Sequence, residues 1–173
     1  GTPLDAMLAR WADGEADVAY LKARYREYQL AHHDAMTHPY PDAVATVRAL
    51  HAAGHPLGIV TSKLEVGARR ALTLLQIERC FDVVVGMDAT TRHKPEPEPV
   101  WHALERLGGI APRRALFVGD STHDMRAGRA AGVHTAAALW GPFSRAQLEP
   151  TTPDHWLEGF GEVRGLVTRL AMA

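Results

Sequence analysis

The run Ala115-Leu116-Phe117-Val118-Gly119-Asp120-Ser121-Thr122-His123-Asp124 decides the fold of this chain. Its opening residues are apolar and too few for an ordinary helix, which predicts a buried strand over residues 115–119. Asp120 and Asp124 then fall where this strand gives way to a loop. In open α/β sheets, ligands bind beyond the carboxyl ends of the strands. Placing two carboxylates there costs free energy unless a positive charge compensates them. Mg²⁺ is the cation that this donor chemistry favours.

Strands and helices alternate around this run. Short apolar runs predict further strands over residues 57–61, 81–86 and 135–139, and an edge strand near residues 155–157. Segments of helical periodicity separate them, and we expect helices over residues 44–53, 64–75, 100–107, 124–131 and 163–170. This alternation indicates an α/β fold in which helices cover both faces of a parallel sheet.

The first 38 residues differ from the rest because they carry helical patterns only. Residues 4–11 place apolar side chains on one helical face, and residues 17–36 predict a long amphipathic helix. Its apolar stripe, which we expect to be core, consists of Val18, Leu21, Tyr25, Tyr28, His32 and Ala35. The chain therefore divides into a small helical unit, residues 1–38, and an α/β unit, residues 39–173.

Composition excludes several classes of protein. The formal net charge of −1 gives no electrostatic reason to expect nucleic acid or an anionic membrane as partner. No apolar run approaches the roughly 18 residues of a membrane-spanning helix. The single Cys80 cannot form an internal disulfide and fits a reducing compartment, so we expect a cytoplasmic protein. The sequence leaves a homo-oligomer open.

Three further polar residues follow predicted strands. Thr61 and Ser62 come after the strand over residues 57–60, and Lys94 comes after the strand over residues 81–86. A hydroxyl can bind phosphate oxygens, and a lysine supplies positive charge against a phosphoryl group. With Asp120 and Asp124 these residues predict a site for phosphate and a cation.

Each residue also has a simpler interpretation. Thr61 fits a strand-end hydroxyl or a helix cap, and Lys94 fits a solvated loop. Asp120 fits the cap of the following helix, with Asp124 as an acid in its first turn. The order of these residues, each after a successive strand, favours the joint site.

The segments Val60-Thr61-Ser62-Lys63, Lys94-Pro95-Glu96-Pro97 and Val118-Gly119-Asp120-Ser121-Thr122-His123-Asp124 together resemble motifs two, three and four of the haloacid dehalogenase (HAD) superfamily. The resemblance covers nearly the whole chain. It is strongest to the branch of phosphoglycolate phosphatases and related pyrophosphatases, which carry a helical cap. It implies a Rossmann-like α/β core over residues 39–173 and the C-terminal part of a cap over residues 1–38.

The resemblance also implies a role for each candidate residue. Thr61, with Ser62 beside it, would bind the transferring phosphoryl group, and Lys94 would stabilise its charge. Asp120 would coordinate Mg²⁺, with Asp124 as a second ligand, direct or through water. The substrate would be a small phosphorylated metabolite, hydrolysed through an aspartyl-phosphate.

One departure from the family concerns its first motif, Asp-x-Asp-Gly-Thr, which does not occur before Thr61. That motif would supply the nucleophilic aspartate and a central strand between the strands at residues 57–60 and 115–119. Without the carboxylate, the chain as printed is expected to be inactive. We expect the motif to lie in a missing upstream segment. The alternatives are a catalytically inactive phosphate-binding relative or scaffold protein, and dehalogenase-type chemistry, against which the predicted Mg²⁺ site argues.

Overall fold

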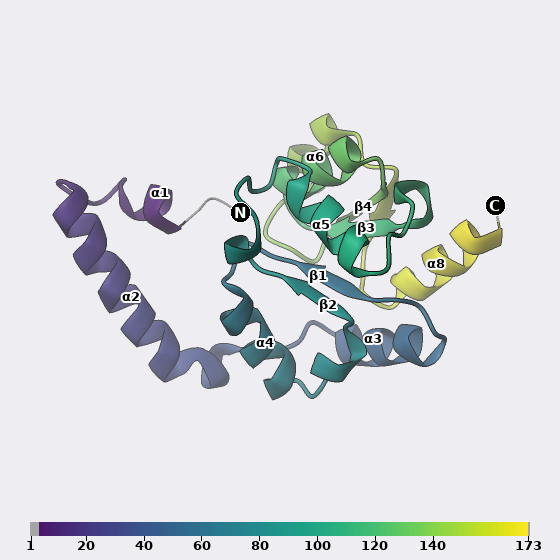
Figure 1. The fold of residues 1–173 in the computed structure, drawn as a ribbon, viewed down its shortest axis with the longest axis horizontal. Helices are drawn as coiled ribbons and strands as arrows, with labels where there is room; N and C mark the ends of the chain where they lie inside the picture. Colours follow the sequence, from purple (N-terminus) through teal and green to yellow (C-terminus); the bar gives the residue numbers. More distant parts are fainter. Residues whose placement is uncertain (1–3, 173) are drawn as a thin grey trace. The chain divides into compact units, whose positions relative to one another are not determined.

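The computed structural model describes residues 4–172 and divides the chain into two units, residues 1–38 and 39–173. Figure 1 shows the elements of both units in the order of the sequence. The fold class is confirmed as α/β with parallel strands. No helix among the described residues is long and apolar enough to cross a membrane.

From residue 4 onward, the first unit consists of two helices, α1 (Leu4–Leu8) and α2 (Glu15–Met36). Lys22 on α2 lies 2.8 Å from the carboxylate of Asp5 on α1, which links the two helices. The expectation that the apolar stripe of α2 is core is wrong, because no described residue of the helix is buried, and Tyr25 and Tyr28 are exposed. A unit this small has too little chain to bury such a stripe by itself.

Among its described residues, 39–172, the second unit contains five short parallel strands in two sheets. Strands β1 (Gly58–Val60) and β2 (Val83–Val85) form one sheet. Strands β3 (Leu116–Gly119), β4 (His134–Ala138) and β5 (His155–Leu157) form the other, in that order. The single sheet expected from the sequence is thus divided. Within residues 4–172, no strand pairing joins β1 to β3.

Helices follow the strands as the periodicity predicts. Their observed bounds are α3 (Ala43–Ala52), α4 (Glu65–Leu74), α5 (Glu98–Arg106), α6 (Thr122–Ala131), α7 (Arg145–Leu148) and α8 (Glu162–Met172). Single 3₁₀ turns lie at η1 (Glu78–Cys80), η2 (Met87–Ala89), η3 (Pro112–Arg114) and η4 (Glu149–Thr151). The predicted strand over residues 81–86 is shortened to three residues, since turns η1 and η2 lie close on either side of it.

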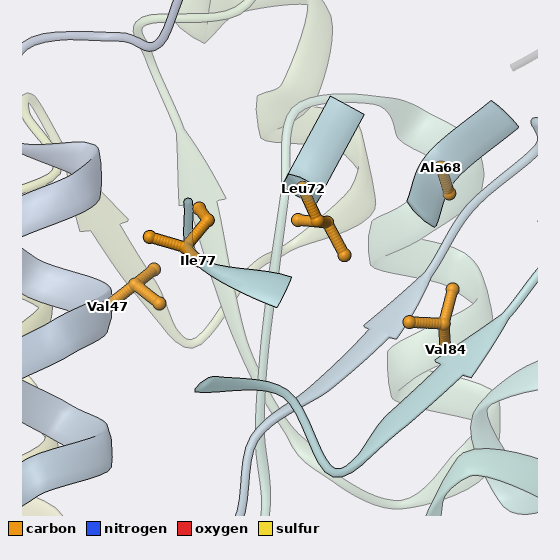
Figure 2. Close-up of a cluster of buried hydrophobic side chains, with 5 residues drawn as sticks. All are labelled: Val47, Ala68, Leu72, Ile77 and Val84. Carbon is orange, nitrogen blue, oxygen red and sulfur yellow. The ribbon is translucent and has the colours of Figure 1, made fainter. Parts of the chain in front are cut away.

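Strand β2 is buried on both faces, as its three consecutive valines suggest. On one face Val84 packs in a cluster with side chains from α3, from α4 and from Ile77, drawn in Figure 2. On the other face Val83 and Val85 pack against Ala103 of α5. The buried strand therefore joins the two helical layers of this half of the unit.

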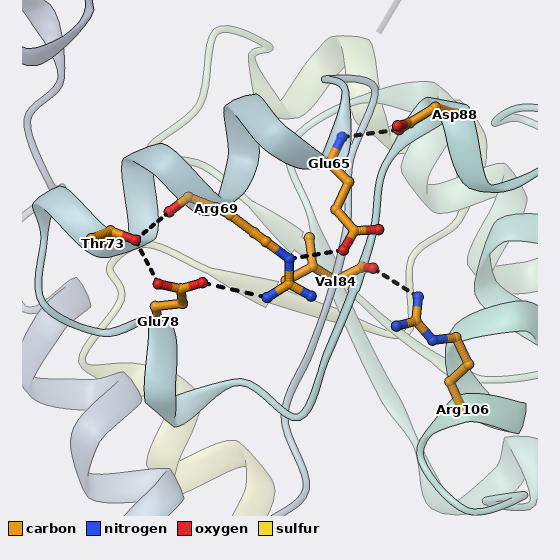
Figure 3. A network of polar contacts seen from close by, with 7 residues as sticks. All are labelled: Glu65, Arg69, Thr73, Glu78, Val84, Asp88 and Arg106. Atoms are coloured by element: carbon orange, nitrogen blue, oxygen red, sulfur yellow. Dashed lines mark hydrogen bonds and ion pairs between the residues drawn. The ribbon is translucent and has the colours of Figure 1, made fainter.

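A polar network fixes the start of α4 to the loop that follows β2 (Figure 3). Asp88 accepts a hydrogen bond from the backbone N–H of Glu65 at 2.9 Å, and Met87 donates its N–H to the carbonyl of Lys63 at the same distance. Further along α4, Arg69 pairs with both Glu65 and Glu78. These contacts hold the segment after β1 in place. That segment contains Thr61.

The cluster of Figure 2 yields a test of packing, using two leucines of the same helix. Leu72 of α4 is buried, whereas Leu74 is 40% exposed. We expect Leu72→Ala to lower the free energy of unfolding by about 2–4 kcal/mol, because it removes contacts and leaves a cavity. Leu74→Ala is the matched control and should cost less than about 1 kcal/mol. Chemical denaturation measures both, and equal losses would contradict this packing.

Candidate active site

Lys94 is the centre of the site because its side chain contacts residues from both parts of the divided sheet. We call these parts, β1–β2 and β3–β4–β5, the two half-sheets. The Nζ of Lys94 lies 2.6 Å from Oδ1 of Asp124, on α6 after β3, and 3.4 Å from the carbonyl oxygen of Val60 in β1. The side chains of Lys94 and Asp124 are only 9% and 8% exposed. The simpler interpretation of Lys94 as a solvated loop residue is therefore wrong. A buried ion pair of this kind is costly to break from one side, since the remaining charge loses its partner.

The second oxygen of Asp124 completes the N-terminal cap of α6. Oδ2 accepts hydrogen bonds from the Ser121 hydroxyl at 2.6 Å and from the Ser121 backbone N–H at 3.1 Å. The Ser121 hydroxyl in turn accepts from the Asp124 backbone N–H, which makes a reciprocal capping box. The helix cap is thus Ser121 and not Asp120, so the capping interpretation of Asp120 is wrong. Asp124 does lie in the first turn, and it binds Lys94 as well.

Two glycines let the carboxylates approach the backbone closely. A Cβ added to Gly119 would lie 2.3 Å from Cβ of Asp124, and one added to Gly141 would lie 2.3 Å from Cβ of Asp120. Gly119 ends β3, while Gly141 lies in the loop after β4. The contact from Gly141 was not predicted from the sequence. The sequence feature that could have indicated this contact is a glycine just beyond the end of the last core strand, where ligand sites form.

The two carboxyl groups differ in their affinity for protons. Burial raises the pKa of Asp120 above its ordinary value, and the negative charge of Asp124 raises it further. Burial also opposes ionisation of Asp124, but the charge of Lys94 and the hydrogen bonds from Lys94 and Ser121 outweigh it and lower the pKa of Asp124. Asp120 is therefore the carboxylate with charge still to be neutralised. Burial also lowers the pKa of His123 between them.

Thr61 lies at the same end of the second unit. Its hydroxyl accepts a hydrogen bond from the Lys63 N–H at 3.2 Å, and it lines one cavity of about 580 Å³ together with Lys94, Asp120 and Asp124. The sequence predicted this convergence, and the structure brings these four residues together. Ser62 is exposed and does not line that cavity, so its hydroxyl is not brought to the same point.

The carboxylate donors that line the cavity fit Mg²⁺. Among the described residues no group of three His, Cys, Asp or Glu side chains could hold a metal by itself. Mg²⁺ is ordinarily held by one or two carboxylates, with water and substrate phosphates completing the shell. Asp120 is partly buried, and within residues 4–172 no basic side chain forms a close ion pair with it. With Asp124 beside it, Asp120 matches that pattern.

The second unit thus gathers a lysine, a threonine and two aspartates at the carboxyl ends of parallel strands, where ligands bind in open α/β sheets. The sequence matches the family model of haloacid dehalogenase-like hydrolases over residues 1–138. The chain belongs to the haloacid dehalogenase-like hydrolase family.

Individual relatives agree with this assignment. The chain is 37% identical to pyrophosphatase PpaX of Bacillus cereus over 156 residues, which cover 90% of this chain and 72% of the relative. Pyrophosphatase PpaX of Bacillus mycoides is 36% identical, over 84% of this chain and 67% of the relative. Among solved structures, a predicted phosphoglycolate phosphatase from Haemophilus somnus superposes with a TM-score of 0.81 at 26% identity, covering 88% of this chain and 68% of that one.

The contrast between the two carboxyl groups predicts opposite effects of the same substitution. In metal-free buffer at pH 7, Asp124→Asn should lower the free energy of unfolding by about 3–5 kcal/mol, because Lys94 stays buried without its partner. Asp120→Asn should raise the melting temperature, because it removes a charge that burial and Asp124 disfavour. Thermal and chemical unfolding with a chelator present measure both.

The pH dependence checks the cause of each effect. The pKa of Asp120 is raised on folding, so ionised Asp120 costs stability above that raised pKa, and the advantage of Asp120→Asn should shrink as the pH falls towards 4. The pKa of Asp124 is lowered, so its contribution to stability is present above the ordinary value of 3.8 and is lost only as the pH falls through the lower folded value. Two destabilised variants at pH 7 would refute the contrast.

Gly141 yields a separate prediction. Gly141→Ala should displace the Asp120 side chain, since the new Cβ would overlap it, and should weaken Mg²⁺ binding at least tenfold in calorimetry. Gly159→Ala is the matched control, because a Cβ there meets nothing within 4 Å. Unchanged Mg²⁺ affinity in Gly141→Ala would remove Asp120 from the cation site.

Proposed function

We propose that this chain carries the phosphate- and cation-binding part of a Mg²⁺-dependent phosphatase that hydrolyses a small phosphorylated metabolite. The observation that supports this most is the buried Lys94–Asp124 ion pair, which shares one cavity with Asp120 and Thr61. A phosphoryl group in that corner would meet a lysine charge and a hydroxyl, beside a carboxylate fitted for a cation. These are the components that phosphoryl transfer requires.

Each residue has a distinct role in the proposal. Lys94 stabilises the negative charge on the transferring phosphoryl group, and Thr61, which the exposed Ser62 follows in the sequence, binds one of its oxygens. Asp120 holds Mg²⁺, and Asp124, kept ionised by Lys94, is its second ligand, direct or through water. Mg²⁺ supplies electrostatic neutralisation of the phosphoryl oxygens.

We infer that the nucleophile lies outside this chain, on an upstream segment. No Asp-x-Asp precedes Thr61, and the relatives are longer than the matched region. A carboxylate oxygen from that segment attacks phosphorus, and the bond from phosphorus to the leaving-group oxygen breaks. Water then hydrolyses the resulting aspartyl-phosphate to inorganic phosphate and restores the carboxylate. In the proposal, residues 1–38 are the C-terminal part of a helical cap.

The relatives support a proposal for the substrate class. The pyrophosphatase PpaX relatives and the predicted phosphoglycolate phosphatase from Haemophilus somnus suggest a pyrophosphate- or phosphoglycolate-like substrate. Both are small and highly anionic, which suits the positive charge of Lys94. The alternative is an inactive relative that keeps the phosphate pocket, and the absence of Asp-x-Asp before Thr61 is the observation that favours it.

The test uses the protein expressed from its complete gene, with its N-terminus established by intact mass. We expect Mg²⁺-dependent release of phosphate from an aryl phosphate and from pyrophosphate. Asp120→Asn and Lys94→Ala should each lower kcat/KM at least a hundredfold, because each removes charge stabilisation. Glu96→Gln is the matched control, since Glu96 is an exposed acid of the Lys94 loop, and it should keep the parental rate.

Two results would contradict the proposed phosphatase. If the protein with a confirmed N-terminus binds phosphate and Mg²⁺ in calorimetry but releases no phosphate from either compound, the inactive alternative replaces the phosphatase. If Lys94→Ala keeps the full rate, the reaction takes place elsewhere on the molecule.

A further inference from the structure

Lys94 belongs to a loop, residues 90–97, that connects turn η2 to helix α5. The structure places its Nζ at two acceptors, on Val60 and on Asp124. A lysine side chain has several rotatable bonds, and fixing them costs conformational entropy. Both contacts therefore depend on a backbone that is itself held in place at residue 94. The contacts that hold this loop decide where the Lys94 charge lies.

Glu98, the first residue of α5, binds the beginning of this loop with both of its carboxylate oxygens. Oε1 accepts a hydrogen bond from the Thr91 N–H at 3.0 Å, and Oε2 accepts one from Nε of Arg92 at 2.8 Å. The bond from Arg92 and then the bond from Thr91 lower the pKa of Glu98, so its carboxylate is ionised at neutral pH. The two ends of the loop are thereby joined, and Lys94 lies on the segment between them.

Two further hydrogen bonds shape the segment inside this closure. The Thr90 hydroxyl donates to the carbonyl of Arg92 at 3.0 Å, and the Glu96 N–H donates to the carbonyl of His93 at 2.9 Å. The second bond closes a turn that contains Lys94. The lysine backbone is therefore held within a turn whose position is set by the ends of the loop.

Helix α5 gives the Glu98 carboxylate a rigid support. Val100 and Leu104 pack in a buried cluster with residues of α6, and Ala103 packs against the buried strand β2. Within residues 4–172, the donors to the Glu98 carboxylate come from the loop and none from α5, so this side chain does not cap its own helix. A loop bound to the first residue of a packed helix is fixed relative to the core.

We propose that Glu98 is a positioning residue of the site, whose carboxylate closes the loop and thereby holds the Lys94 ammonium group at Asp124. Glu98 does not line the cavity, so it acts through Lys94 and does not touch the substrate. The catalytic consequence rests on the proposed function, whereas the placement of Lys94 can be measured without turnover.

The reactivity of Lys94 towards an acylating reagent measures its placement. The 173-residue chain and its variants are treated with N-hydroxysuccinimidyl acetate at pH 8, and acetylation of each lysine is followed by mass spectrometry. The Lys94 side chain is 9% exposed and ion-paired, so it should react slowly, and Lys22 and Lys63 serve as internal references. Glu98→Ala should speed acetylation of Lys94 about fivefold or more against these references, because the loop opens more often.

Two variants separate loop closure from other effects of the substitution. Glu98→Asp keeps the negative charge that favours the first turn of α5, but it shortens the side chain by one methylene, so it should also speed acetylation of Lys94. Glu96→Ala is the matched control, because Glu96 is an exposed acid of the same loop, and it should leave the Lys94 rate unchanged. Circular dichroism checks the folding of each variant, and Glu98→Asp carries the test if Glu98→Ala does not fold.

Three results would overturn the proposal. They are an unchanged Lys94 rate in folded Glu98→Ala, an equal increase in Glu96→Ala, and a parental rate in Glu98→Asp, which would make charge and not reach decisive.

Activity of the protein expressed from its complete gene separates this inference from the proposed function. There, Glu98→Ala should lower kcat/KM about tenfold, because the lysine charge is misplaced, while Glu96→Ala keeps the parental value. If the parent releases no phosphate but Lys94 acetylation responds as expected, the phosphatase is refuted and the positioning role stands. If the enzyme is active and Lys94 stays protected in Glu98→Ala, the positioning role is refuted and the phosphatase stands.

Discussion

The structure depends on one buried charge, the ammonium group of Lys94. It reaches the carbonyl of Val60 on one half-sheet and the carboxylate of Asp124 beyond the other, and it is the polar link across the cavity between them. Because both partners are shielded from water, the pair holds Asp124 ionised in a site where burial alone would favour its protonated form. The same pair leaves Asp120 close to a second negative charge, which is the electrostatic condition for attracting a cation.

Close packing around the two aspartates converts this charge arrangement into a defined geometry. Gly119 and Gly141 permit backbone contact with Asp124 and Asp120 that any side chain would prevent. The reciprocal Ser121–Asp124 cap orients the carboxylate at the start of α6. The network at the start of α4 holds the Thr61 segment from the opposite half-sheet. Each half-sheet thus positions a different part of the site: Thr61 follows β1, and Asp120 and Asp124 follow β3.

Much of this arrangement follows from local sequence patterns. The apolar runs of β2 and β3 and the Gly-Asp at residues 119–120 predicted strands and the acids at their ends, because burial and strand geometry act over a few residues. The Val60 carbonyl and Gly141 were not predicted, since their contacts depend on tertiary packing. The prediction that the apolar stripe of α2 is core was wrong. Helical periodicity identifies a face that can be buried, but it does not show whether another element covers that face.

The most direct test of this account measures the two carboxyl groups themselves. Carbon-13 NMR of the side-chain carboxyls, titrated in metal-free buffer, gives separate pKa values for Asp120 and Asp124. The account predicts a pKa below the ordinary value of 3.8 for Asp124 and above it for Asp120, with the pKa of Asp124 rising in Lys94→Met. An Asp124 that titrates at or above its ordinary value, or is unchanged in Lys94→Met, would contradict the central role of the ion pair.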